Sequence, residues 1–380
     1  MEPTQPHTVS TAIIAGLAFL FAMLLLAGAW YYLFGRTAQI GTHAELYERL
    51  IVENPSFAEG EQNIQQGDYA KAVQSYRQAY ATLDDSLEKI KAQTMVAQAK
   101  QRDGDFTGSI ADFKTVAAEN IAGAARPRAY AAMQIARMYF YHSAEPAVTA
   151  EIFADEPYAS FLVPGNKAET QLQLFQYAAA LYPLAGAVLQ VANSYANGLV
   201  APGANLTELD VANRKDQIRQ SLVLAEADMA YMREDGHLQS LLSSALLARA
   251  LVLGKLNEAG ITDLGDADIA YRAALQDYTQ YEGNGADGFT RYYYAVYLAR
   301  TLGSSSAVRV QELLKPIYAD AQYARSPIVL LILGNRPFFS DEPDRKRELV
   351  QLANLDSNFK NYLLKLGWAS SELTASSASR

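Results

Sequence analysis

The sequence contains no cysteine and only four histidines among its 380 residues. Without cysteine the chain can form no disulfide bond, no thiolate metal site and no cysteine nucleophile. The histidines lie far apart in the sequence, and no two form the i, i+4 pair of a helical metal site. Basic residues are also the minority, with 32 lysines and arginines against 41 acidic residues and a net charge of −9. A nucleic-acid surface needs a basic stripe, so we expect no nucleic-acid partner.

Sequence motifs that carry catalytic chemistry are lacking as well. The chain has no H-E-x-x-H, no Walker-type glycine loop and no G-x-S-x-G. A formal G-x-G-x-x-G runs from Gly283 to Gly288, but a helical pattern precedes it where a dinucleotide site needs a strand. We therefore expect a turn there, no cofactor and no enzyme. The acidic residues on helices leave one alternative, a membrane-tethered helical enzyme acting on cell-wall glycan.

Charged side chains are missing from one long segment, residues 11–34. As a helix of about 1.5 Å per residue this segment would extend roughly 36 Å, enough to cross a hydrocarbon core of about 30 Å. Trp30, Tyr31 and Tyr32 stand where an interfacial aromatic belt is expected, and Arg36 follows them. We predict a single transmembrane helix at residues 11–34, preceded by a tail at residues 1–10 and held in the lipid bilayer.

Two questions about this segment stay open from the sequence. Ala27-Gly28-Ala29 matches the small-x-small pattern of a cleaved signal peptide, although no lysine or arginine precedes the apolar run. Arg36 and Arg49 after the run favour a cytoplasmic C-terminal domain. By analogy, single-span bacterial proteins with short N-terminal tails more often place a large C-terminal domain outside. We expect a retained anchor and an extracytoplasmic domain.

Helical hairpins are indicated after the apolar run. Residues 35–52 are predicted to contain a linker and a short helix, which Asn54-Pro55 ends because a residue before proline avoids the helical conformation. Gly67 can adopt the left-handed conformation that closes the next helix, and Asp68 can cap the helix after it. Small Gly60 would let the two helices approach closely, with Tyr76 filling the space between them.

The same arrangement recurs 37 residues later, where Gly104-Asp105-Phe106 repeats Gly67-Asp68-Tyr69. A repeat period in the mid-thirties is typical of a helical solenoid. Residues 53–86 and 90–123 resemble tetratricopeptide repeats, and residues 248–281 are similar to them. Besides the turns, the matching residues are small or aromatic: Gly60, Ala72, Tyr76 and Ala79 in the first copy, Ala97 and Phe113 in the second, and Ala267, Tyr271 and Ala274 in the third.

The resemblance implies an all-α fold, in which two tetratricopeptide-like repeats at residues 53–123 lead into a degenerate array at residues 124–366. No run of strand-type alternation argues against this. A charged helix from Asp341 to Leu366 would close the array with the polar outer face that a terminal repeat needs. The Ser/Ala-rich residues 367–380 are predicted to be disordered.

Tetratricopeptide arrays bind partners in a groove lined by the first helix of each pair. Transferring the groove positions gives ten residues: Asn54, Phe57, Glu61, Ile64 and Gln65 in the first copy, and Lys91, Thr94, Gln98, Gln101 and Arg102 in the second. Tyr293 and Tyr297, which share one helical face, form a second candidate surface. Solvated helix faces and aromatic packing between helices are the alternatives. We predict a membrane-anchored scaffold that binds protein or peptide partners, as an assembly or translocation accessory factor.

Overall fold

The computed structural model describes most of the chain from residue 36 to residue 317 and parts of the segment after it: residues 36–201, 203–235, 238–281, 288–317, 347, 349–351, 353–354, 360–361, 363–364 and 368–373. These residues form helices and turns and include no β-strand, which confirms the all-α class. The predicted transmembrane segment, residues 11–34, lies outside them. Within them, no helix combines the length and the apolar character that crossing a membrane requires.

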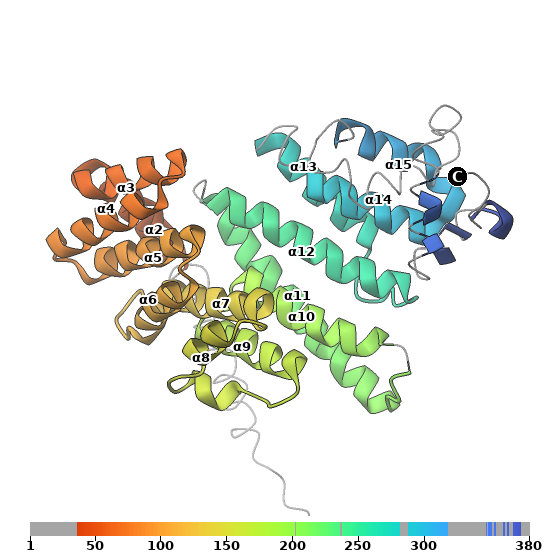
Figure 1. Cartoon of the computed structure of the whole chain (residues 1–380), viewed down its shortest axis with the longest axis horizontal. Helices are drawn as coiled ribbons and strands as arrows, with labels where there is room; N and C mark the ends of the chain where they lie inside the picture. The colour runs from red at the N-terminus through yellow and green to blue at the C-terminus, as the bar shows by residue number, and fades with distance from the viewer. Residues whose placement is uncertain are drawn as a thin grey trace, which may run out of the picture. The chain divides into compact units, whose positions relative to one another are not determined.

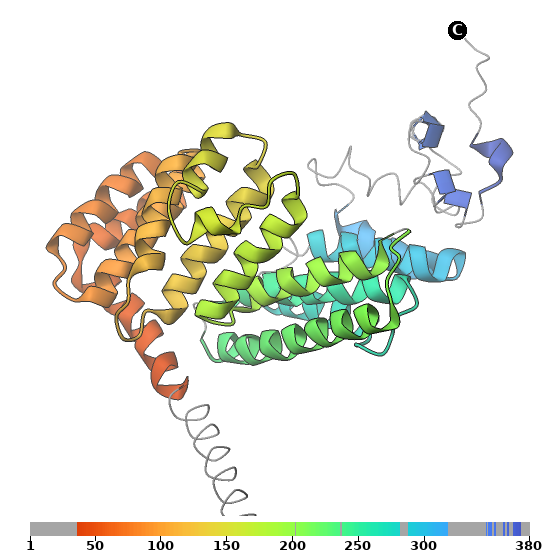
Figure 2. The ribbon, with the colours of Figure 1, turned by 90° about the horizontal axis from the view of Figure 1, so that it is seen from below.

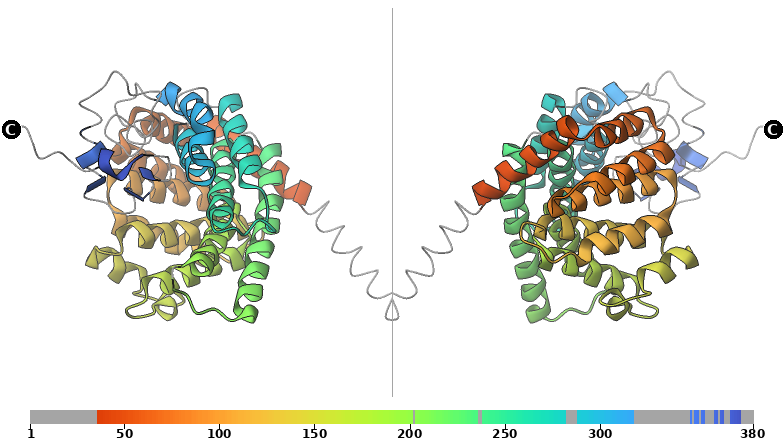
Figure 3. Two further views of the ribbon diagram at one scale, coloured as in Figure 1. Left: turned by 90° about the vertical axis from the view of Figure 1, so that its right-hand side faces the viewer. Right: turned by 90° about the vertical axis from the view of Figure 1, so that its left-hand side faces the viewer.

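The chain divides into two compact units, residues 1–127 (unit 1) and residues 128–380 (unit 2). The division lies close to residue 123, where the second repeat was expected to end. The described helices of unit 1 are α2 (Arg36–Glu53), α3 (Pro55–Gln66), α4 (Tyr69–Thr82), α5 (Ser86–Asp103) and α6 (Phe106–Ala118). Each packs against the next along the chain, so the helices lie side by side (Figures 1 and 3).

Helix α2 is longer than the sequence suggested. It runs from Arg36 to Glu53, whereas the sequence predicted a linker followed by a short helix within residues 35–52. Gly41 lies inside it, which a helix interior tolerates at a cost of about 1 kcal/mol relative to alanine. The predicted end is confirmed, because Asn54 leaves the helical conformation with φ −117° and ψ 99°.

The Gly-Asp turns close both hairpins of unit 1 as predicted. Gly67 (φ 77°) ends α3 in the left-handed conformation, and the Asp68 carboxylate accepts a hydrogen bond from the Lys71 backbone N–H at 3.3 Å. In the second copy Gly104 has φ 87°, and Asp105 accepts from the Gly108 N–H at 2.9 Å. Glycine adopts this conformation without the penalty that a Cβ atom brings, so these turns are fixed locally by sequence.

Close packing of α3 on α4 depends on Gly60. A Cβ atom added there would lie 2.5 Å from Cε1 of Tyr76, whose side chain is fully buried. The Tyr76 ring packs edge-on against Phe57, with ring centroids 5.3 Å apart. The predicted contact between a small residue and an aromatic ring is therefore confirmed in the first copy.

A second contact between the paired helices recurs at equivalent positions with different chemistry. In the first copy Asn63 Nδ2 donates to Ser75 Oγ at 3.3 Å. In the second copy, 37 residues later, Lys100 Nζ forms an ion pair with Asp112 at 2.6 Å. Both pairs join the first helix of a hairpin to the second across a largely buried interface, so the two copies share geometry beyond their matching residues.

Unit 2 continues the helical architecture. Its described elements are α7 (Ala125–His142, starting at the end of unit 1), α8 (Pro146–Ile152), the 3₁₀ helix η2 (Tyr158–Phe161), α9 (Lys167–Leu181), α10 (Ala185–Val200), α11 (Glu208–Glu234), α12 (Gln239–Glu258), α13 (Ala267–Tyr281), α14 (Gly288–Leu302), η4 (Gly303–Ser306), α15 (Ala307–Leu314), η5 (Lys315–Ile317) and η7 (Ser370–Glu372). Helices α10, α11 and α12 lie side by side (Figure 2). Pro127 stands in the first turn of α7, where proline is tolerated.

The third expected copy forms a helical pair, α12 and α13, with a longer connection than in the first two copies. Counting back from Tyr271 by the spacing of the first copy leads to Lys255, but the glycine that packs on the ring is Gly254. Its Cβ would lie 3.0 Å from the Tyr271 hydroxyl. Asn257 holds the connecting loop by donating to the carbonyls of Ile261 and Gly265 and accepting from the N–H of Ala267.

The C-terminal part of the chain is described only in pieces. Most of the predicted helix from Asp341 to Leu366 lies outside the described residues. At the start of the segment predicted to be disordered, residues 367–380, the structure has the 3₁₀ helix η7 and a fully buried Leu373. Residues 374–380 are outside the described part of the chain.

We expect the Gly60→Ala substitution to destabilise the α3–α4 hairpin by about 1–3 kcal/mol, because the fully buried Tyr76 ring has no space to move away from the added methyl group. The measurement is the free energy of opening of α3 and α4 amides by native-state hydrogen exchange. Glu59→Ala, at an exposed position of the same helix, is the matched control and should change it by less than about 0.5 kcal/mol. Equal effects of the two variants would contradict the packing argument.

Candidate functional site

Two of the predicted groove residues serve the fold of unit 1. The Asn54 side chain caps α3 by accepting from the Phe57 N–H at 3.0 Å, and it donates to Thr82 Oγ1 at 3.2 Å. Phe57 is fully buried between aromatic rings, with the ring of Tyr47 at 6.0 Å and that of Tyr76 at 5.3 Å. The burial of Phe57 leaves none of its side chain at the surface for a partner.

Glu61 lies at the centre of a polar cluster. Its carboxylate accepts a hydrogen bond from the Tyr76 hydroxyl at 2.8 Å and a second one from the Tyr47 hydroxyl. Burial, together with the negative charge of Glu61 and its hydrogen bonds, raises the pKa of both phenols well above the ordinary value. The two tyrosines therefore stay protonated and donate to a carboxylate that the sequence had assigned to a partner.

Helix α2 contacts three of the predicted groove residues, Phe57, Glu61 and Lys91. Tyr47 of α2 reaches Phe57 and Glu61 on α3, and Lys91 of α5 lies over its ring with Nζ 4.8 Å from the centroid. One turn away on α5, Glu88 forms an ion pair with Arg49 of α2 at 2.7 Å. Part of the expected groove is thus covered by this chain itself.

Gln98 and Arg102 of α5 remain at the surface. Gln98 is partly buried, and Arg102 is exposed and makes no hydrogen bond or ion pair with the residues that the structure describes. Steps of seven and four residues place Lys91, Gln98 and Arg102 on one side of the helix, over about 16 Å of its length. We call Phe57, Glu61, Lys91, Gln98 and Arg102 together the α3–α5 face.

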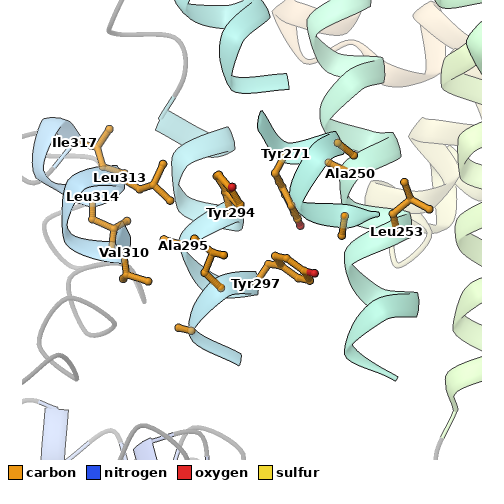
Figure 4. Close-up of a cluster of buried hydrophobic side chains, with 14 residues drawn as sticks. Ala250, Leu253, Tyr271, Tyr294, Ala295, Tyr297, Val310, Leu313, Leu314 and Ile317 are labelled. Carbon is orange, nitrogen blue, oxygen red and sulfur yellow. The ribbon is translucent and has the colours of Figure 1, made fainter. Parts of the chain in front are cut away.

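The second candidate surface separates into core and surface residues (Figure 4). Tyr297 is buried, with its ring centroid 5.4 Å from that of Tyr271, and Tyr294 stacks on Tyr271 at 5.2 Å. Tyr293 is 37% exposed and packs against Tyr292. Aromatic packing between helices thus explains Tyr297, and Tyr293 alone of the predicted pair lies at the surface.

A polar cluster that the sequence did not reveal ties α13, α14 and α15 together. The Tyr294 hydroxyl donates to Asp268 at 2.5 Å, and Arg309 forms an ion pair with the same carboxylate at 3.1 Å. The Arg309 guanidinium also lies 4.9 Å from the centre of the Tyr294 ring. These residues come from three helices, and no local spacing could have indicated their contact.

One buried acidic residue, Asp228, has a structural role. Asp228 of α11 is buried, as a catalytic acid would be, but its carboxylate accepts from the Ala185 N–H at 2.8 Å and so caps the start of α10. In the described part of the chain, no group of three or more histidine or acidic side chains is placed to hold a metal ion. The glycine motif is preceded by α13, a helix, instead of the strand that a dinucleotide site requires.

We predict that the stability of unit 1 falls as the pH rises above about 10, the ordinary pKa of tyrosine. Tyrosines of the unfolded chain ionise there, whereas folding raises the pKa of Tyr47 and Tyr76, so the stabilisation is complete below this pH and is lost above it. Tyr76→Phe should reduce the slope by up to about 1.4 kcal/mol per pH unit. Hydrogen exchange or denaturant unfolding between pH 8 and about 11.5 measures it. An unchanged slope would contradict the assignment.

No protein-family model matches the chain, and no curated protein does. The relation to tetratricopeptide repeats is therefore a resemblance in sequence pattern.

Proposed function

We propose that the chain is a membrane-anchored scaffold, tetratricopeptide-like in architecture, whose helical array binds a protein or peptide partner on the α3–α5 face. The role is noncatalytic, in assembly or translocation at a membrane surface. The charge-free run at residues 11–34 supplies the anchor in this proposal.

The observation that carries the binding role is the exposure of Arg102 and its lack of an ion pair with the described residues. Arg102 lies on the helix that the resemblance assigns to the groove, whereas Lys100 two positions earlier is paired with Asp112. Arginine is enriched among the residues that dominate binding energy, because its planar guanidinium makes several hydrogen bonds at once. Gln98, one helical turn before Arg102 on the same side of α5, is partly buried.

We expect a photo-crosslinking amino acid at Gln98 of the full-length protein to form a defined adduct in native membranes. Adding Arg102→Glu should lower the yield of that adduct about tenfold. The variant loses a central arginine contact and introduces charge repulsion, and together these cost more than the about 1.4 kcal/mol that corresponds to a tenfold change in affinity. The same crosslinker at Arg77, exposed on α4, is the control. Equal adducts from the two positions, unaffected by Arg102→Glu, would rule out the α3–α5 face as the binding surface.

The proposed topology has a direct test because the chain lacks cysteine. Val52 is 82% exposed near the end of α2, so Val52→Cys introduces one accessible thiol without disturbing the core. We expect a membrane-impermeant maleimide to label it in intact cells, in keeping with an extracytoplasmic domain. Labelling that requires permeabilised cells would place the domain in the cytoplasm.

A further inference from the structure

We infer that α2 is a releasable intramolecular ligand of the α3–α5 face, and that a partner reaches Phe57, Glu61 and Lys91 only when α2 leaves. This inference rests on the proposed function for the partner, but release of α2 is a property of unit 1 alone. The partner that fits the vacated face is an amphipathic helix carrying leucine, tyrosine and leucine in the spacing of Leu46, Tyr47 and Leu50.

The contacts of α2 are those of a helix bound to a groove. Leu46 and Leu50 are 8% and 1% exposed and join the cluster that contains Phe57 and Met95. One turn of helix separates the two leucines, so they form a single apolar edge. Tyr47 beside them packs on Phe57 and hydrogen-bonds to Glu61.

Polar contacts surround this apolar edge. Lys91 lies over the Tyr47 ring, and Arg49 pairs with Glu88 at the rim, where the arginine side chain is 49% exposed. An apolar centre within a charged rim is the usual anatomy of an interface between separate molecules. A rim ion pair of this exposure contributes little affinity and mainly fixes orientation.

The connection between α2 and α3 permits release. A single residue, Asn54, separates Glu53 from Pro55, and its backbone is extended. Asn54 stays attached to unit 1 through its hydrogen bonds to Phe57 and Thr82. Helix α3 therefore keeps its cap whether α2 is docked or not. Moving α2 away requires rotation of the Asn54 backbone and loss of the hydrogen bond from the Asn54 N–H to the Leu50 carbonyl.

Helix α2 also differs from the hairpins that follow it. The turns at Gly67 and Gly104 tie α3 to α4 and α5 to α6 by left-handed closure and side-chain caps. Among the described helices α2 has no preceding partner, and α3 is the main helix it packs against. Within the part of the chain that the structure describes, the contacts of α2 lie on the side that carries Leu46, Arg49 and Leu50. A helix packed in this way at the end of a stack is expected to open before the rest of its unit.

The first test is native-state hydrogen exchange on the full-length protein. We expect α2 amides to open at least about tenfold more often than those of α3 to α5, and Leu46→Ala/Leu50→Ala to increase that ratio further while α3 to α5 stay protected. Val52→Ala, exposed on the same helix, is the control. Opening of α2 only together with α3 to α5, in wild type or variant, would make it an integral helix and overturn the inference.

The second test uses a fluorescent synthetic peptide of residues 36–53 as the probe. Wild-type protein should bind it at least about tenfold more weakly than the Leu46→Ala/Leu50→Ala protein, because the tethered α2 competes at high effective concentration. A peptide with the same two substitutions should not bind. Absence of peptide binding to the folded double variant would refute a vacated site.

A milder variant covers the case in which the double substitution disturbs folding. Arg49→Glu places a second carboxylate beside Glu88, and this repulsion, more than the loss of the ion pair, should loosen α2 and admit the peptide. Arg49→Glu with Glu88→Arg should restore the docked state. Failure of this rescue would contradict the docking of α2 through Arg49 and Glu88.

The two proposals can fail independently. If α2 release succeeds while the Gln98 adduct is absent, the proposed partner fails and the releasable helix stands. If the adduct forms at the same yield whether α2 is loosened or docked, control by α2 fails and the binding function stands.

Discussion

The fold of unit 1 depends on the close packing of α3 against α4 at Gly60. Gly60 has no side chain, so the Tyr76 ring lies where a Cβ atom would otherwise be. The ring can then contact Phe57, place its hydroxyl on Glu61 and fill the space between α3 and α4. A short turn at Gly67 and Asp68 is compatible with this geometry only because the helices approach so closely.

The other hairpins satisfy the same constraint with different residues. Gly254 packs on Tyr271 in unit 2 although the connecting loop is much longer. Lys100 and Asp112 replace the Asn63–Ser75 hydrogen bond of the first copy by an ion pair. Close packing thus fixes the size of the facing residues, while the polar pair across the interface only has to be complementary.

Helix α2 covers part of the α3–α5 face. Residues that a repeat pattern assigns to a partner are already engaged, since Tyr47 contacts both Phe57 and Glu61 and lies under Lys91. Only the far end of the face, with Gln98 and Arg102, lies beyond these contacts. If the proposed function holds, binding at that end and release of α2 would be separate steps on one surface, and a partner longer than a few residues would involve both.

The sequence by itself determined the all-α class, the left-handed turns at Gly67 and Gly104, and the pairing of Gly60 with Tyr76, because each depends on residues within one helix or one helical hairpin. Only the tertiary structure decided which groove residues are accessible. Burial of Phe57 and Tyr297 follows from helices that pack from elsewhere in the chain, and the spacing within one helix carries no information about them. Tyr47 and Lys91 are 44 positions apart in the sequence and lie on different helices. Their contact therefore could not be found from a repeat pattern, and neither could the covering of the face by α2.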